Sequence, residues 1–153
     1  MQSKWHILIG FVFSYALVCF FNFSIFSGII IFLSSWMIDG DHYLWYGLAM
    51  RDWNPVAAIR WNNSLEPKWY SLSKEQMLKF KLKTLICHGI LFWAILFLLS
   101  YIHIIFLWVL IGVAIHMVAD WVDLIKHKEP LYYKILPCLT FIRNKKKKPV
   151  TEL

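Results

Sequence analysis

Two long apolar blocks without a charged residue constrain the fold more than any other feature of this sequence. Neither residues 7–38 nor residues 84–119 contain Asp, Glu, Lys or Arg. A single helix through the first block would be about 48 Å long at about 1.5 Å per residue, whereas the hydrocarbon core of a bilayer is about 30 Å thick. Each block has a polar interruption near its middle, at residues 22–24 and at residues 100–103. We therefore predict that each block folds back on itself as a pair of membrane-crossing helices.

The predicted fold is an all-α integral membrane protein with four transmembrane helices arranged as two hairpins. The composition agrees, because 59% of the residues are hydrophobic and only 16% are charged, compared with roughly 25% charged in soluble domains. Ser73 and Gln76 fit a capping box at the start of the third helix. The four helices are expected at about residues 5–21, 24–41, 76–99 and 104–125.

Two other interpretations of the apolar blocks remain open. Each block could form one long, steeply tilted helix that crosses the bilayer once. The first block could instead belong to a cleaved signal peptide with Lys4 as its basic region. Against a signal peptide, the run is much longer than a signal core and no small-residue cleavage site ends it.

In the hairpin arrangement, every charged residue falls on one side of the membrane. All sixteen Lys and Arg residues lie in 1–6, 47–83 or 126–148, and all nine acids lie in 39–75 or 120–152. Basic residues accumulate in cytoplasmic segments. We therefore assign this side and both termini to the cytoplasm, in a multi-pass protein of the inner (cytoplasmic) membrane.

Two segments are expected to lie along the cytoplasmic membrane surface. Within a membrane domain at 1–128, the loop 47–72 mixes Trp, Tyr, Arg and Lys, as interfacial segments do. The tail 129–153 contains the run Lys145–Lys148, which would attract anionic lipid at about 1 kcal/mol per charge. A solvated topology anchor is the alternative for this run. Nucleic acid is not an expected partner, because the basic residues stay close to the membrane segments.

Histidine and aspartate side chains gather near the cytoplasmic ends of the four predicted helices. Counted from the two polar interruptions, these residues lie at comparable depths on different helices. Ionisable groups in a membrane segment cost about 2.5–3.5 kcal/mol at mid-bilayer on insertion scales, so such a cluster needs a compensating partner. A divalent cation would provide it. The predicted metal ligands are His6, Asp39, Asp41, His42, His88, His116 and Asp120.

The residue types and spacings suit metal binding. Histidine and aspartate are ligands of zinc, manganese and iron, and zinc is the first expectation. His116 and Asp120 are four residues apart and share a helix face, as do Asp39 and His42 at a spacing of three. Asp41 points elsewhere unless the backbone relaxes at the glycine before it. The metal-free alternatives are helix caps, interfacial histidines and hydrogen-bonded His–Asp pairs.

Four short motifs, in their order along the chain, carry a family resemblance. They are His6 in KWHILIG, Asp39-Gly40-Asp41-His42, His88 in TLICHGILF, and His116-Met117-Val118-Ala119-Asp120. This order resembles that of the predicted membrane-bound metal-dependent hydrolases of bacteria and archaea, which are similar to zinc-dependent phospholipase C. Ile38 replaces the proline of the family pattern. The family's H-R-G-x-T-H-S motif corresponds to residues 83–89, where only the last histidine is retained.

The expected function is that of a metal-dependent hydrolase at the cytoplasmic membrane surface. A bound metal lowers the pKa of its water toward 7 and polarises an ester oxygen, and Asp41 or Asp123 would act as general base. The position at the headgroup plane and the resemblance both suggest a phospholipid or lipid-linked ester as substrate. The alternatives are a metal-binding or transport protein, and a catalytically divergent member that serves structure or partner binding.

Overall fold

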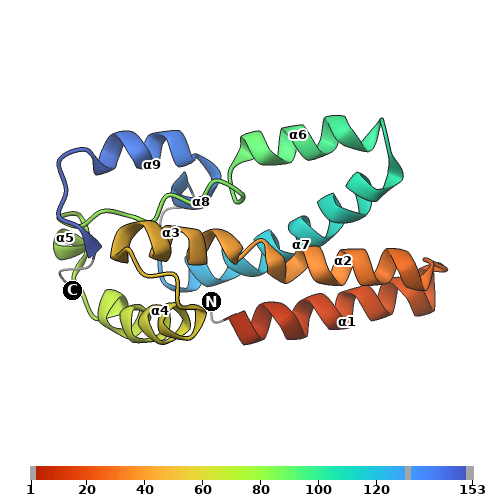
Figure 1. Ribbon diagram of the computed structural model, residues 1–153, viewed down its shortest axis with the longest axis horizontal. Coiled ribbons are helices and arrows are strands. Elements are labelled where there is room, and N and C mark those ends of the chain that lie inside the picture. Colours follow the sequence, from red (N-terminus) through yellow and green to blue (C-terminus); the bar gives the residue numbers. More distant parts are fainter. Residues whose placement is uncertain (1–2, 130–131, 151–153) are drawn as a thin grey trace.

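The protein is all-α, as seen in a computed structural model that describes residues 3–129 and 132–150 (Figure 1). Its helices are α1 (Ser3–Phe21), α2 (Ile25–Met37), α3 (Gly40–Met50), α4 (Pro55–Tyr70), α5 (Lys74–Met77), α6 (Ile90–Ser100), α7 (Ile104–Lys126), α8 (Tyr132–Ile135) and α9 (Pro137–Asn144). Figure 1 shows α1, α2 and α6 on one side and α3, α4, α5, α8 and α9 on the other. Helix α7 runs from the first group into the second and so connects them.

The two predicted interruptions are tight turns between antiparallel helices. Residues 22–24 join α1 to α2, and residues 101–103 join α6 to α7. Asn22 has a φ of 56°, the left-handed conformation that commonly follows a helix end. The side chains of Ser24 and His103 then cap the starts of α2 and α7. Each apolar block is therefore a hairpin, and the alternative of two long helices is wrong.

Small residues allow α2 to pack closely against both α1 and α7. A Cβ atom added at Gly112 would clash with the carbonyl oxygen of Ile31, and one added at Gly10 would clash with the Ser35 side chain. Close backbone approach at small residues is typical of helix packing in membranes. This packing brings residues of α1, α2 and α7 to one side of the cluster described below.

Apolar side chains cover the outside of the hairpin helices. The helical segments Lys4–Phe21 and Ile104–Lys126 are long and apolar enough to cross a membrane, and only 17% of the first and 33% of the second is buried. Large exposed side chains include Phe11, Phe20 and Ile25. Soluble proteins rarely expose contiguous apolar surface of this extent, and such a surface marks a partner or a membrane.

The helix predicted at 24–41 ends early, and this break shapes the site. Helix α2 stops at Met37, and α3 begins at Gly40. Between them the backbone hydrogen bonds tighten to a spacing of three residues, as in Asp41 N–H to Ile38 O at 3.3 Å. The relaxation expected at Gly40 thus lies in the two residues directly before it, Ile38 and Asp39. Asp39 and Asp41 then contact different histidines, His116 and His88 respectively.

The single helix predicted at 76–99 is wrong. The predicted capping box of Ser73 and Gln76 is present, but α5 ends after one turn, and residues 78–89 are irregular up to the start of α6. The C-terminal tail provides the missing hydrogen bonds, because the Asn144 side chain bonds both the N–H and the C=O of Leu82, at 2.9 and 2.7 Å. Long-range pairing therefore replaces helical hydrogen bonds in this segment.

The segment predicted as an interfacial loop at 47–72 is largely helical. Helix α4 starts at Pro55, and the Asn54 side chain accepts hydrogen bonds from the N–H groups of Val56 and Ala57 at 2.9 and 3.2 Å. An Asn cap followed by proline is a strong helix start. Helix α4 forms one wall of the cavity beside the candidate site.

Candidate metal centre

Six of the seven predicted metal ligands meet at one place, at the junction between the two helical hairpins and the remaining helices. They come from α1, from the α2–α3 turn, from α3, from the segment before α6 and from α7. Their ligand atoms form three overlapping groups in which all atoms lie within 4.8 Å of one another: His6, Asp39 and His116; Asp39, His42 and His88; and His88, His116 and Asp120. Tertiary packing thus brings together residues up to 114 positions apart (120 − 6).

The inner triad, which we define as His88, His116 and Asp120, has the spacing of a metal site. The two histidine Nε2 atoms lie 3.1 Å apart, and Asp120 Oδ2 lies 3.4 Å from that of His88 and 3.3 Å from that of His116. Around a tetrahedral zinc ion with bonds of about 2.0–2.1 Å, neighbouring ligand atoms are about 3.3–3.4 Å apart. The three atoms therefore fit one face of such a coordination sphere.

Hydrogen bonds on the far ring nitrogens orient both histidines of the inner triad. His116 Nδ1 lies 2.7 Å from the Ser35 carbonyl oxygen, and His88 Nδ1 lies 2.9 Å from Asp41 Oδ2. Both partners are acceptors, so each Nδ1 carries a proton and each neutral ring offers its Nε2 lone pair. Two lone pairs at 3.1 Å repel each other unless a proton or a metal ion lies between them.

The charge environment of His88 also favours a cation at this point. Burial lowers the pKa of His88, but its hydrogen bonds to Asp120 and Asp41 and the charge of Asp41 raise it more, and the net shift is upward. A site that attracts a proton attracts a divalent metal for the same electrostatic reason, and the two compete.

The outer triad, which we define as Asp39, His42 and His88, is more open. His42 Nε2 lies 3.7 Å from Asp39 Oδ1, and the two side chains are 24% and 18% exposed. Burial, together with the charges of Lys83 and Lys134, holds the pKa of His42 well below its usual range. His42 is therefore neutral at physiological pH, the form in which imidazole binds metal.

His6 connects the cluster to α1. Its Nε2 atom lies 3.4 Å from Asp120 Oδ1, and its ring stacks on His116 with the centroids 3.9 Å apart. Among the residues that the structure describes, the buried atoms His6 Nδ1 and Asp39 Oδ2 have no hydrogen-bond partner. Buried polar atoms without a partner are rare in native proteins, and a bound ion or water is the usual reason.

The structure places Asp41, predicted as ligand and as general base, behind His88. Its Oδ2 atom accepts from His88 Nδ1 and, at 3.3 Å, from the Cys87 N–H. Asp41 belongs to none of the three groups that could hold a metal among the described residues. A carboxylate on the far nitrogen of a ligating histidine fixes its tautomer and raises its basicity, and this is what the geometry of Asp41 allows.

Lys134 is a component that our sequence interpretation missed. It comes from α8, is 7% exposed, and its Nζ lies 2.5 Å from Asp120 Oδ2. A buried lysine requires a partner, and a lone lysine in the apolar stretch LYYKILPC was the only signal in the sequence. Lys134 and the inner triad share the same carboxylate oxygen.

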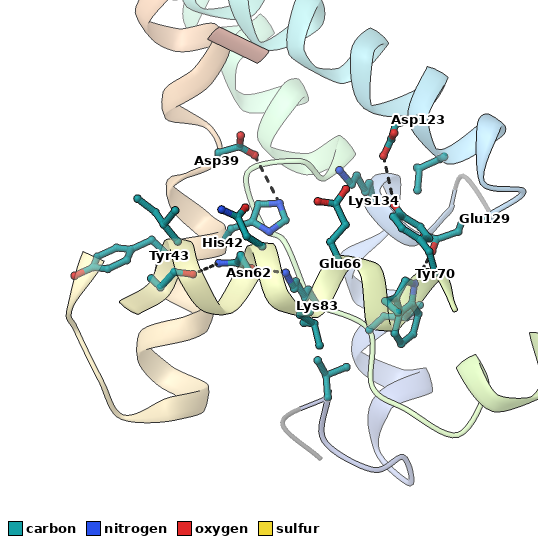
Figure 2. Close-up of a pocket in the computed structure, with 18 of the residues that line it drawn as sticks. Asp39, His42, Tyr43, Asn62, Glu66, Tyr70, Lys83, Asp123, Glu129 and Lys134 are labelled. Carbon is teal, nitrogen blue, oxygen red and sulfur yellow. Dashed lines mark hydrogen bonds and ion pairs between the residues drawn. The ribbon is translucent and has the colours of Figure 1, made fainter. Parts of the chain in front are cut away.

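A cavity of about 320 Å³ opens beside the outer triad. Figure 2 shows Asp39 and His42 on one side of it, and Asp123, Tyr70 and Glu129 on the other. Asp123, the second predicted general base, is half-buried; its Oδ2 lies 3.4 Å from the Tyr70 hydroxyl and its Oδ1 lies 3.5 Å from His127 Nδ1. Asp123 thus faces the cavity without belonging to the metal-binding groups.

Comparison of the chain with protein-family models, with curated proteins and with solved structures gave no match. The site is therefore defined by its own geometry. That geometry provides a buried cluster of histidines and aspartates that could hold a metal ion, with a cavity next to its more open part.

Proposed function

We propose that this protein is a membrane-bound metal-dependent hydrolase that acts at the cytoplasmic membrane surface on a phospholipid or lipid-linked ester. One observation carries the proposal: candidate metal ligands from distant parts of the chain meet beside a cavity that a substrate can enter. Zinc is the metal that we propose first, since its preferred distances match the inner triad, with manganese and iron as alternatives. The resemblance of the four motifs to membrane-bound metal-dependent hydrolases agrees with this proposal.

We further propose that α1, α2, α6 and α7 cross the bilayer as two hairpins, with both termini in the cytoplasm. The exposed apolar side chains support this arrangement, as does Figure 1, where both hairpin turns lie at the end away from the polar helices. Helices α2 and α6 have 13 and 11 residues, so they are about 20 and 16 Å long. The bilayer would thin around them, at a modest cost per ångström of mismatch.

The proposed chemistry divides the work among the residues of the site. When bound, a divalent metal would supply Lewis-acid polarisation of the substrate and an activated water. His42 and Asp39 hold the side of the centre that faces the cavity, and Asp41 keeps His88 in the tautomer that leaves its Nε2 free. Asp123, on the cavity wall, accepts the proton of the attacking water as general base.

Hydrolysis of chromogenic esters tests this proposal. The purified protein in detergent is treated with chelator, reloaded with zinc or manganese, and given a phosphodiester and a carboxylic ester of p-nitrophenol. We expect metal to restore hydrolysis of one of them in wild type and in His103→Ala, a histidine at the opposite hairpin turn, but not in His42→Ala. Hydrolysis that survives chelation, or that His42→Ala leaves unchanged, would contradict the proposal, as would metal-loaded protein that hydrolyses neither ester.

The topology has its own test. A reporter fused after Ser100 is expected on the outer side of the membrane, because this position lies at the turn of the second hairpin. A cytoplasmic signal there would exclude the two-hairpin arrangement.

The second candidate function is a structural membrane protein whose polar cluster needs no metal. The ion pair between Lys134 and Asp120 favours it, because the lysine already supplies a buried positive charge. A metal transporter is less well supported, since the hairpin turns carry no acidic or basic side chain apart from His103.

A further inference from the structure

Three lysines line the cavity beside the outer triad. Lys81 and Lys83 belong to the irregular segment before α6, and Lys134 comes from α8, so different parts of the chain supply them. Figure 2 shows Lys83 and Lys134 at the cavity with the Glu66 side chain between them in this view. The candidate ligands Asp39 and His42 line the same cavity.

Lys83 lacks the partner that a lysine in this environment normally has. In the described part of the chain it forms no ion pair with a carboxylate; its Nζ donates a hydrogen bond to the neutral amide oxygen of Asn62 at 2.6 Å. Its ammonium group also lies 5.4 Å from the ring centroid of Trp61 and 5.9 Å from that of Trp45. These contacts fix the position of the charge but do not neutralise it.

Lys134 lines the same cavity as Lys83, and its ammonium group is paired with Asp120, which does not line the cavity. Burial and the neighbouring charge of Lys134 lower the pKa of Lys83 to about 8. Like charges that face one cavity are costly, and proteins keep them where an anion binds. The charge of Lys83 therefore supports a role in ligand binding that its position already suggests.

Four carboxylates line the same cavity as the three lysines: those of Asp39, Glu66, Asp123 and Glu129. Asp39 is a candidate metal ligand, and Glu129 accepts a hydrogen bond from the Trp69 indole at 2.6 Å. Burial raises the pKa of Glu129. Asp123 has Tyr70 and His127 as partners, and Glu66 is the carboxylate whose charge acts most strongly on Lys83.

We propose that Lys83 and Lys134 form an anion subsite that binds the phosphoryl group of the substrate next to the metal centre. This subsite rests on the proposed function and narrows it, because a phosphate ester carries negative oxygens for two lysines, whereas a carboxylic ester is neutral. Charge-assisted hydrogen bonds from lysine to phosphate oxygens are strong and recurrent. The same chemistry fits a lipid headgroup or a soluble phosphate ester.

Binding of two probes to the full-length protein in detergent or in nanodiscs tests the subsite. Inorganic phosphate is titrated calorimetrically at pH 7, and phosphatidic acid is offered in nanodiscs of neutral lipid. The variants are Lys83→Met, Lys83→Arg and Lys134→Met. The matched control is Lys79→Met, which removes an exposed lysine of the same segment that does not line the cavity. All variants keep Lys145–Lys148, so general attraction to anionic lipid is unchanged.

We expect Lys83→Met to weaken binding of at least one probe by about tenfold or more, Lys83→Arg to retain most of it, and Lys79→Met to leave it unchanged. If Lys83→Met weakens binding of the lipid alone, the ligand is a lipid headgroup. If it weakens binding of both probes, the ligand is a phosphate ester in general. If it weakens binding of phosphate alone, the ligand is a soluble ester. Binding of neither probe, or equal binding by Lys83→Met and Lys79→Met, overturns the subsite. Lys83 contacts no candidate metal ligand directly, so we expect Lys83→Met to fold. Its binding data therefore decide the test even if Lys134→Met fails to fold.

Metal content measured on the same samples separates this proposal from the proposed function. Lysine-dependent phosphate binding by protein that takes up no metal would refute the hydrolase and retain the anion subsite. Metal-dependent hydrolysis without lysine-dependent phosphate binding would retain the hydrolase and refute the anion subsite.

Discussion

The inner and outer triads use the same residue types and share His88, but they differ in their access to the surroundings. In the inner triad the side chains of His88 and His116 are 0% exposed and that of Asp120 is 1% exposed. In the outer triad His42 and Asp39 are 24% and 18% exposed and face the cavity. Closed metal sites are typically structural, and open ones are typically catalytic. We infer that the inner triad stabilises the junction of the helices, while the outer triad meets the substrate.

The inner triad is expected to matter most for folding. Asp120→Asn removes the negative charge that His6, His88, His116 and Lys134 all contact, and it leaves a buried lysine without its counter-ion. Breaking one partner of a buried pair costs about 3–5 kcal/mol of unfolding free energy. Denaturant unfolding in mild detergent, followed by tryptophan fluorescence, measures this loss. Asp123→Asn, on the same helix but outside both triads, serves as control. Equal destabilisation by both variants would contradict the special importance of the inner triad for folding.

Asp41 connects the two triads, because it holds the histidine that they share. Asp41→Asn keeps the size of the side chain but weakens its hold on His88 Nδ1. Loss of such an outer partner typically lowers metal affinity about 10–100-fold. Competition with a metal-sensitive dye measures this affinity. If Asp41→Asn binds metal as tightly as wild type, Asp41 does not set the tautomer of His88.

Lys134 is expected to weaken metal binding at the inner triad, whereas Asp41 is expected to strengthen it. Its ammonium group forms an ion pair with Oδ2 of Asp120, the oxygen that belongs to the inner triad. The lysine charge therefore repels a metal ion at this position. We expect Lys134→Met to raise metal affinity about tenfold, because a charge within a few ångströms costs at least this much in a partly buried site. Isothermal titration with zinc checks this, with Lys145→Met as control. Weaker metal binding in Lys134→Met would mean that the lysine supports the site.

The smallest expected effect is a pH dependence on the cavity side. The protonated, charged form of Lys83 binds anions, and its pKa is lowered to about 8 by burial and by Lys134, against the opposing charges of Glu66, Asp39 and Asp41. Anion binding is thus close to fully present at about pH 7 and below, and it declines as pH rises through about 8. Sulfate, whose charge is constant in this range, is the appropriate probe. Lys83→Arg should keep sulfate binding constant to pH 9, and an identical decline in both proteins would assign the titration elsewhere.

The sequence was sufficient to predict features that depend on local pattern. The polar interruptions at 22–24 and 100–103 predicted both turns. Each apolar block is too long for one membrane-crossing helix, so a break near its middle is expected. Depth counted from these turns then placed His6, His88 and His116 at one level. Convergence of the candidate ligands therefore followed from helix length and hairpin geometry alone.

The features that the sequence could not provide depend on long-range contacts. Residues 78–89 were predicted as part of a helix, but they are irregular, and Asn144 hydrogen-bonds to the backbone of this segment. Lys134 follows α7 in the chain, in α8, and its ion pair with Asp120 is a tertiary contact that no local pattern predicts. The helix start at Asn54-Pro55 was a local signal that a reading of residues 47–72 as interfacial loop overlooked.

Elemental analysis shows directly whether the His–Asp cluster binds a divalent metal. Protein is purified in detergent from cells grown in metal-replete medium, and metal per chain is measured for wild type, His116→Ala, Asp39→Ala and the distant control His103→Ala. We expect at least one equivalent of metal in wild type and in His103→Ala, with a clear loss in His116→Ala and Asp39→Ala. A wild-type protein that is folded and metal-free, and whose fold survives both substitutions, would contradict the account.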